Sequence, residues 1–229
     1  MFQSVMPDQP APDRHFDLIA FDWDGTLFDS TAVIVRSIQQ AVSDVGGRMP
    51  SDKDAAYVIG MGLSAALAHA APDVAPERHA ELGARYKHHY MAEQQGISLF
   101  EGVLDMLHEL KARQHLLTVA TGKSRSGLDA ALNAVELREL FDASRTADET
   151  QGKPHPLMLH QLMAEFGVSP QRTLMIGDTT HDLQMARNAG CASVAVSYGA
   201  HSAEAFAALE PLFVAHSLRE LHQWLRLHA

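Results

Sequence analysis

The sequence of 229 residues predicts an α/β fold in which a parallel β-sheet carries an inserted, all-helical subdomain. Two observations support this fold class. From residue 98 onward, short apolar runs alternate with helical periods, and right-handed crossovers then require a parallel sheet that is covered on both faces. By contrast, residues 30–97 contain several helical segments and no convincing strand, which is far more chain than one crossover needs.

Each predicted strand is a short apolar run, which is typical of a strand buried on both faces. The first run covers residues 16–21 and ends at Asp22, where the chain turns polar. The other strands are expected at residues 116–120, 173–176, 192–196 and, with a weaker pattern, 141–146.

Helical periods lie between these runs. Leu159, Leu162 and Phe166 recur at helical spacing, and Gly167 follows them where a left-handed cap favours glycine. The last helix begins with Ser217 and Glu220 at the spacing of a capping box. Within the insert, helical segments are expected over about 31–45, 52–58, 63–71 and 76–95.

These elements predict three parts of the chain. Residues 1–14 form a loose tail, because three prolines and many polar residues leave almost nothing to bury. Residues 15–29 and 98–229 form a Rossmann-like catalytic core, and residues 30–97 form a helical cap. The connections between core and cap are expected near residues 29–31 and 96–100.

The composition excludes several classes of protein. With 18 Lys and Arg against 28 Asp and Glu, the net charge is −10 and no basic cluster interrupts it, which argues against nucleic-acid and membrane partners. The single cysteine, Cys191, cannot form an internal disulfide or a Cys-rich metal site. No apolar run approaches the roughly 20 residues that span a bilayer, and the first 15 residues lack the features of a signal peptide. We therefore expect a cytoplasmic protein.

Acidic residues follow two of the predicted strands. Asp22 and Asp24 come directly after the first strand, and Asp178 and Asp182 follow the strand at 173–176. Because ligands of open parallel sheets bind at the carboxyl ends of the strands, these residues should meet at one edge. Aspartate also caps helices, but capping alone does not explain two paired motifs at strand ends. Four carboxylates would repel each other without a cation, and oxygen ligands favour Mg²⁺.

Four motifs follow one another along the chain. They are Phe-Asp-Trp-Asp-Gly-Thr-Leu-Phe-Asp-Ser (21–30), Ala-Thr-Gly-Lys (120–123), Gly-Lys-Pro-His-Pro (152–156) and Ile-Gly-Asp-Thr-Thr-His-Asp (176–182). With these motifs in order, the chain resembles the haloacid dehalogenase (HAD) superfamily. The resemblance is to its phosphoglycolate-phosphatase-like hydrolases, which carry a helical cap after the first motif, and it covers roughly residues 16–228. It implies a HAD-like core and a Mg²⁺-dependent phosphomonoester hydrolase that acts on a small phosphorylated metabolite, with phosphoglycolate as the family-level expectation, through an aspartyl-phosphate intermediate.

The resemblance also implies a role for each site residue. Asp22 would attack phosphorus, which suits a carboxylate because it needs no deprotonation at neutral pH. Asp24 would protonate the leaving oxygen and then deprotonate the attacking water. Thr121, the amides near Gly122 and Lys153 would bind the phosphate. The Mg²⁺ would be held by Asp22, by Asp24 through its carbonyl, by Asp178 and by Asp182, the last directly or through water or Lys153.

Other functions remain as alternatives. A phosphomutase similar to β-phosphoglucomutase would keep both Asp22 and Asp24, so these residues leave hydrolase and mutase open. A dehalogenase would lose the second aspartate, and a catalytically idle binding protein would lose at least one of these groups. A phospho-accepting signalling module would be about half this length and would have no cap. The substrate, the cap residues that select it and the oligomeric state stay open. Outside the site, we expect Trp23 in the core and Lys123 at the surface.

Overall fold

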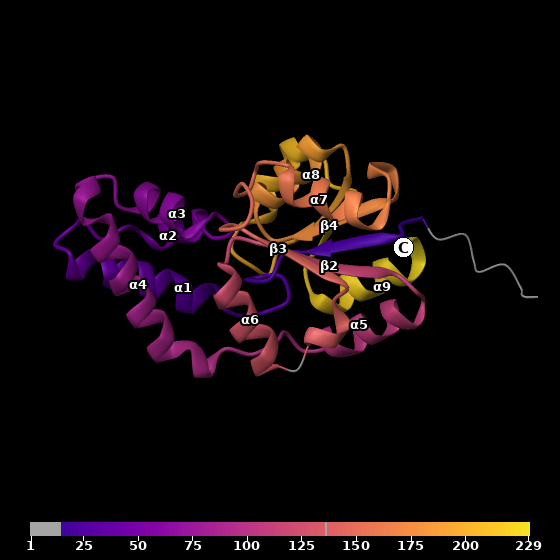
Figure 1. The fold of residues 1–229 in the computed structure, drawn as a ribbon, viewed down its shortest axis with the longest axis horizontal. Helices are drawn as coiled ribbons and strands as arrows, with labels where there is room; N and C mark the ends of the chain where they lie inside the picture. Colours follow the sequence, from indigo (N-terminus) through magenta and orange to yellow (C-terminus); the bar gives the residue numbers. More distant parts are fainter. Residues whose placement is uncertain (1–14, 136) are drawn as a thin grey trace, which may run out of the picture.

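The computed structural model describes residues 15–135 and 137–229, so the predicted tail at 1–14 lies outside the described residues. The described residues form a six-stranded sheet in the order β3-β2-β1-β4-β5-β6, and all neighbouring strands are parallel (Figure 1). This architecture confirms the predicted α/β class. The strands are β1 (Leu18–Phe21), β2 (Leu116–Thr121), β3 (Ala143–Thr146), β4 (Thr173–Gly177), β5 (Ala192–Val196) and β6 (Phe213–Ala215).

The helices that flank the sheet follow the predicted periods. Gly167 and Gly190 adopt φ values of 65° and 73° directly after two of them, as a left-handed cap requires. Ser217 accepts a hydrogen bond from the Glu220 amide, while the Glu220 carboxylate accepts from the amide of His216. The flanking helices are α5 (Val103–Ala112), α6 (Arg125–Ala134), α7 (Leu157–Phe166), α8 (Thr180–Ala189) and α9 (Leu218–His228).

Successive side chains of a strand point to opposite faces of the sheet, and β1 shows the result. Ile19 and Phe21 belong to the hydrophobic cluster that includes α5, α6 and α9, whereas Leu18 and Ala20 belong to the cluster of α7 and α8. Figure 1 shows the two layers on either side of the strands. Trp23 is fully buried in the first cluster, as predicted.

The predicted insert forms helices that pack around a hydrophobic cluster of their own, centred on residues such as Ile38, Val42 and Leu82. Two adjacent connections join it to the sheet, because the Asp29 amide donates to Ser98 O and the Phe100 amide donates to Leu27 O. We refer to residues 31–93 as the helical segment. Its helices are α1 (Thr31–Asp44), α2 (Asp52–Tyr57), α3 (Leu63–Ala70) and α4 (His79–Glu93), with a 3-10 turn, η1 (Pro76–Arg78), before α4.

Short 3-10 turns complete the fold. Besides η1, they are η2 (Gln94–Gly96), η3 (Arg138–Leu140), η4 (Pro170–Arg172) and η5 (Ala203–Leu209).

Among the helices of residues 15–135 and 137–229, none combines the length and the apolar character needed to cross a lipid bilayer.

Candidate active site

The carboxyl ends of three neighbouring strands bring the predicted polar residues to one edge of the sheet. The strand β1 lies between β2 and β4, and the Asp22 amide continues the ladder by donating to Ile176 O at 2.9 Å. Asp178 follows directly after β4, and Thr121 is the last residue of β2. The apolar strand residues that precede Asp22, Thr121 and Asp178 are buried in the core. Their packing fixes the backbone position from which each polar side chain extends.

Three aspartates form the centre of this edge. Asp22, Asp178 and Asp182 are buried, and each offers one carboxylate oxygen within 4.8 Å of the other two. The ammonium nitrogen of Lys153 lies 2.6 Å from Asp22 Oδ1 and 2.6 Å from Asp182 Oδ1. Burial alone would lower the pKa of Lys153, but the neighbouring carboxylates outweigh it and raise that pKa. One ammonium group faces three carboxylates, so the cluster keeps an excess of negative charge.

Hydrogen bonds fix two of these carboxylates. Asp178 accepts from the Thr26 hydroxyl at 3.0 Å and from the Ala200 amide at 2.7 Å. Asp182 Oδ2 accepts from the amide and the hydroxyl of Thr179, and the two residues form a capping box at the start of α8. The capping role of Asp182 therefore coexists with its place in the cluster, because its other oxygen faces Lys153.

The third carboxylate keeps an oxygen without a partner. Within the described part of the chain, Asp22 Oδ2 is buried and makes no hydrogen bond. Burial is the main cause that raises the pKa of Asp22; Lys153 lowers this pKa, and the other two carboxylates raise it further. Burial also raises the pKa of Asp178 to about 7, with the charge of Asp182 acting in the same direction. A buried oxygen-only cluster with excess negative charge suits a divalent cation.

The carboxylate of Asp24 points to a different set of partners. Its Oδ1 accepts from the Ser30 hydroxyl at 2.7 Å, and its Oδ2 lies 3.0 Å from Lys123 Nζ. This carboxylate lies outside the group formed by Asp22, Asp178 and Asp182. A contribution of the Asp24 carbonyl to metal binding stays a prediction.

The expectation that Lys123 lies at the surface is wrong. Its side chain is only 12% exposed, and Nζ contacts the hydroxyl of Tyr90 as well as Asp24. Lys123 directly follows Thr121 and Gly122 in the second motif, which is the signal that could have placed it at the site. Ser30 is the last residue of the first motif, so the same signal could have placed it near Asp24. Tyr90 carries no such signal, since its position depends on how α4 packs.

A loop of the helical segment lies against the end of β2. A Cβ atom at Gly122 would lie 2.5 Å from Met61 O and 2.6 Å from Gly60 O, so only glycine allows this approach. The Thr121 hydroxyl next to it is buried and accepts a hydrogen bond from the Lys123 amide. The predicted phosphate-binding residues thus lie where the sheet and the helical segment meet.

A second contact between the two parts lies at the start of α8. Tyr57 O accepts hydrogen bonds from His181 Nε2 at 2.8 Å and from His201 Nε2 at 3.1 Å. The rings of Tyr57 and His201 are stacked, with centroids 5.5 Å apart. The helical segment therefore touches the sheet edge on both sides of the aspartate cluster.

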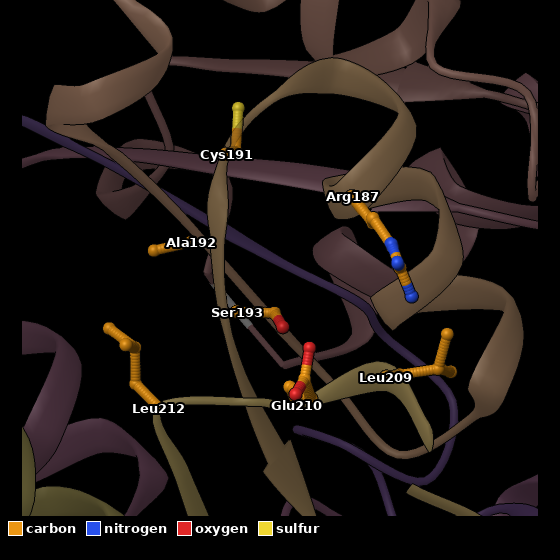
Figure 2. A pocket seen from close by; sticks show the side chains of 7 residues that line it. All are labelled: Arg187, Cys191, Ala192, Ser193, Leu209, Glu210 and Leu212. Atoms are coloured by element: carbon orange, nitrogen blue, oxygen red, sulfur yellow. The ribbon is translucent and has the colours of Figure 1, made fainter. Parts of the chain in front are cut away.

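A pocket at the opposite end of the sheet shares no residue with this cluster (Figure 2). It lies where the chain enters β5, between the end of α8 and residues 209–212, and Arg187, Cys191 and Glu210 are among its lining residues. Burial raises the pKa of the Cys191 thiol to about 12, so this cysteine is a poor nucleophile. In open parallel sheets ligands bind at the carboxyl ends of the strands, which is where the aspartate cluster lies.

Comparison with known proteins shows the family of this chain. The family model described as haloacid dehalogenase-like hydrolase matches residues 19–196. The protein named "Probable phosphatase IndB" of Dickeya dadantii is 33% identical over 89% of this chain and 91% of its own. A phosphoglycolate phosphatase of Vibrio vulnificus is 31% identical over 91% and 95% of the two chains. The crystal structure of a predicted phosphoglycolate phosphatase from Haemophilus somnus superposes with a TM-score of 0.81 at 26% identity, and the match covers 93% of this chain and 99% of that one.

A parallel α/β core with acidic motifs at its strand ends defines the class of the protein. The chain belongs to the haloacid dehalogenase-like hydrolase family. Within that family it is a phosphatase.

Proposed function

We propose that this chain is a Mg²⁺-dependent phosphomonoester hydrolase that forms an aspartyl-phosphate intermediate on Asp22. The setting of Asp22 is the observation that supports this most directly. Its Oδ1 lies 2.6 Å from Lys153 Nζ, while its buried Oδ2 has no hydrogen-bond partner among the described residues. A carboxylate that is held by one oxygen and unpartnered at the other is oriented to act as a nucleophile.

In the first step, Asp22 Oδ2 forms a bond to phosphorus, and the bond between phosphorus and the leaving oxygen breaks. Asp24 donates a proton to that oxygen, so the product leaves as an alcohol. The Thr121 hydroxyl and the amides near Gly122 bind the other phosphate oxygens. Lys153 offsets the negative charge that the nucleophile and the phosphate bring together.

In the second step, water attacks phosphorus and Asp24 accepts the proton that the water loses. The bond between phosphorus and Asp22 breaks, and inorganic phosphate is released. The proton that Asp24 gave in the first step is thereby restored, so each cycle consumes one phosphomonoester and one water molecule.

The residues that would hold Mg²⁺ are Asp22 and Asp178 through their carboxylates and Asp24 through its carbonyl, with Asp182 acting directly or through water or Lys153. When bound, Mg²⁺ would neutralise charge on the phosphate and help to orient it. The donor set supports this choice because all of its atoms are oxygens.

The substrate is a small phosphorylated metabolite. The contact of Gly60 and Met61 with Gly122 brings the helical segment to the phosphate-binding edge, where it acts as a cap and limits access for bulky substrates. Phosphoglycolate is the first substrate to test, because the Vibrio vulnificus relative carries that activity in its name.

The test measures release of inorganic phosphate from phosphoglycolate, from other phosphorylated metabolites and from an aryl phosphate, each with Mg²⁺ and with EDTA. Activity should require the metal. Asp22→Asn should lower kcat/KM by several orders of magnitude without changing circular dichroism, whereas the partly exposed control Asp129→Asn should retain activity. After an acid quench, mass spectrometry should find the phosphoryl group on the peptide that contains Asp22.

Full activity in a metal-free preparation, or a phosphoryl group on another residue, would contradict the proposal. Isomerisation of a sugar phosphate without release of phosphate would instead identify the phosphomutase reaction.

A further inference from the structure

A continuous set of contacts runs from the helical segment to Asp24. The hydroxyl of Tyr90, in α4, accepts a hydrogen bond from Lys123 Nζ at 3.1 Å, and the same nitrogen lies 3.0 Å from Asp24 Oδ2. The three residues come from three separate parts of the chain: the helical segment, the loop after β2 and the loop after β1. They meet only where the helical segment lies over the sheet edge.

Lys123 is held in this position by its surroundings. Its side chain is 12% exposed and that of Asp24 is 11% exposed. Nζ lies 4.9 Å from the centre of the Tyr90 ring, and Tyr86 stacks on that ring. Burial alone would lower the pKa of Lys123, but Asp24 together with Tyr90 and Tyr86 outweighs this effect and raises that pKa, so Lys123 remains an ammonium group.

These contacts orient the Asp24 carboxylate at both oxygens. Ser30 donates to Oδ1 and Lys123 contacts Oδ2, and each oxygen keeps a second lone pair that can accept a proton. A buried ion pair is weak evidence for stability, because desolvation offsets most of the attraction between the charges. The contribution of this pair therefore lies in the geometry of the Asp24 carboxylate.

We infer that Lys123 and Tyr90 are positioning residues for Asp24, and that they hold its carboxylate ready to accept the proton of the attacking water while the helical segment covers the site. The inference rests on the proposed function, which assigns that proton transfer to Asp24. Lys123 fixes the carboxylate, and Tyr90 fixes Lys123 from the helical segment. Movement of α4 away from the core would separate Tyr90 from Lys123 and release the carboxylate.

The experiment separates formation of the phosphoryl-enzyme from its breakdown. With 2,4-dinitrophenyl phosphate the leaving group needs no proton, so formation does not depend on Asp24, whereas breakdown does. Rapid mixing gives formation as a burst of dinitrophenolate and breakdown as the steady rate that follows. The variants are Lys123→Met, Lys123→Arg, Tyr90→Phe and the reference Asp24→Asn. The control is Lys111→Met, which removes a partly exposed lysine from its pair with Asp142.

We expect Lys123→Met to slow breakdown by about tenfold or more, up to the roughly 10²–10⁴-fold that acid–base catalysis contributes, and to leave the burst rate within about twofold. Phosphoryl-enzyme should accumulate, as in Asp24→Asn. Tyr90→Phe should slow breakdown less, by about threefold, and Lys123→Arg should restore part of the lost rate because it keeps the charge. Lys111→Met should match the wild type.

Equal losses in burst size, burst rate and steady rate would show a merely structural role and overturn the inference. If Lys123→Met fails to fold, Tyr90→Phe decides the question, because it removes one hydroxyl; an unchanged breakdown rate in that variant would also overturn the inference. If Asp24→Asn itself accumulates no phosphoryl-enzyme, the proposed role of Asp24 has failed, and this outcome is distinct from a failure of Lys123 alone.

Discussion

Lys153 and Asp22 form a fully buried ion pair, with Nζ 2.6 Å from Oδ1 and side chains that are 0% and 1% exposed. Asp182 contacts the same ammonium group from another side, so a single lysine lies between two carboxylates at the end of the sheet. Replacing one of these charged side chains destabilises the protein, because the remaining charge stays buried without its partner. Substitutions in this ion pair should therefore change the free energy of unfolding as well as the activity.

Lys153→Met should destabilise the protein by about 3–5 kcal/mol at pH 8, because it leaves carboxylates buried without a counter-charge. The loss should shrink as the pH falls, since protonated carboxyls no longer repel each other. Urea unfolding in EDTA at pH 8 and pH 5.5 measures both effects. The control Lys111→Met, whose ion pair is partly exposed, should cost less than about 1 kcal/mol. An equal loss at both pH values would contradict the electrostatic explanation.

Asp178 should make the stability of the metal-free protein depend on pH. Its folded pKa is about 7, above the ordinary range near 4, so between these values the folded protein holds a proton that the unfolded chain has released. The free energy of unfolding should then fall as the pH rises through this window, by about 1.4 kcal/mol per pH unit for one group, and level off above pH 7.

Asp178→Asn should remove this contribution. Its amide can still be paired, because the Thr26 hydroxyl can reverse its role while the Ala200 amide keeps an acceptor. Thermal melts in EDTA from pH 5 to pH 8 should show the variant gaining on the wild type as the pH rises. Added Mg²⁺ should stabilise the wild type more at pH 8 than at pH 6, and the variant much less. Parallel pH curves for the two proteins would rule out this origin.

Gly122→Ala should displace the loop of the helical segment from the end of β2. The added Cβ would lie 2.5 Å from Met61 O and 2.6 Å from Gly60 O, closer than a carbon atom and a backbone oxygen can approach. We expect a lower kcat/KM for every substrate and a larger radius of gyration by small-angle scattering. Gly83→Ala in α4 is the matched control, because its nearest neighbour is 3.9 Å away and alanine favours a helix.

Met61→Ala should change the ranking of small substrates more than the rate with an undemanding aryl phosphate. Its backbone lies against Gly122, so the loop that carries it faces the edge where a leaving group would emerge. Values of kcat/KM across a panel of phosphorylated metabolites measure the effect, with Lys153→Met as a comparison that should lower all substrates together. Equal losses for all substrates in Met61→Ala would remove the loop from substrate selection.

The strand ends could be predicted because their signal is local. An apolar run that ends in Asp22 or in Asp178 specifies both a buried strand and the point where it meets solvent. The strand β6 gives no such signal, since its three residues are too few for a pattern and its pairing with β5 decides its conformation. The helical segment was predictable from the punctuation of its sequence by glycine and proline.

The contacts around Asp24 could be predicted only in part. The motif that contains Lys123 could have placed this residue near the site, but its burial depends on how Tyr90, in α4, packs against it. Tyr90 lies 33 residues away in another part of the chain. The contact between Lys123 and Tyr90 depends on how the helical segment is oriented relative to the sheet, and the periodicity of the sequence carries no information about that orientation.

The two strand-like connections around Asp29 and Ser98 carry a consequence for how such a chain can change. The polypeptide leaves the sheet and returns to it at neighbouring points, where Asp29 N pairs with Ser98 O and Phe100 N with Leu27 O. An inserted segment whose two ends lie side by side can be lengthened, shortened or exchanged without changing the order of the strands. The helical segment can therefore change in sequence and length while the residues at the carboxyl ends of the strands stay the same. Such changes would alter which substrates fit without altering the reaction.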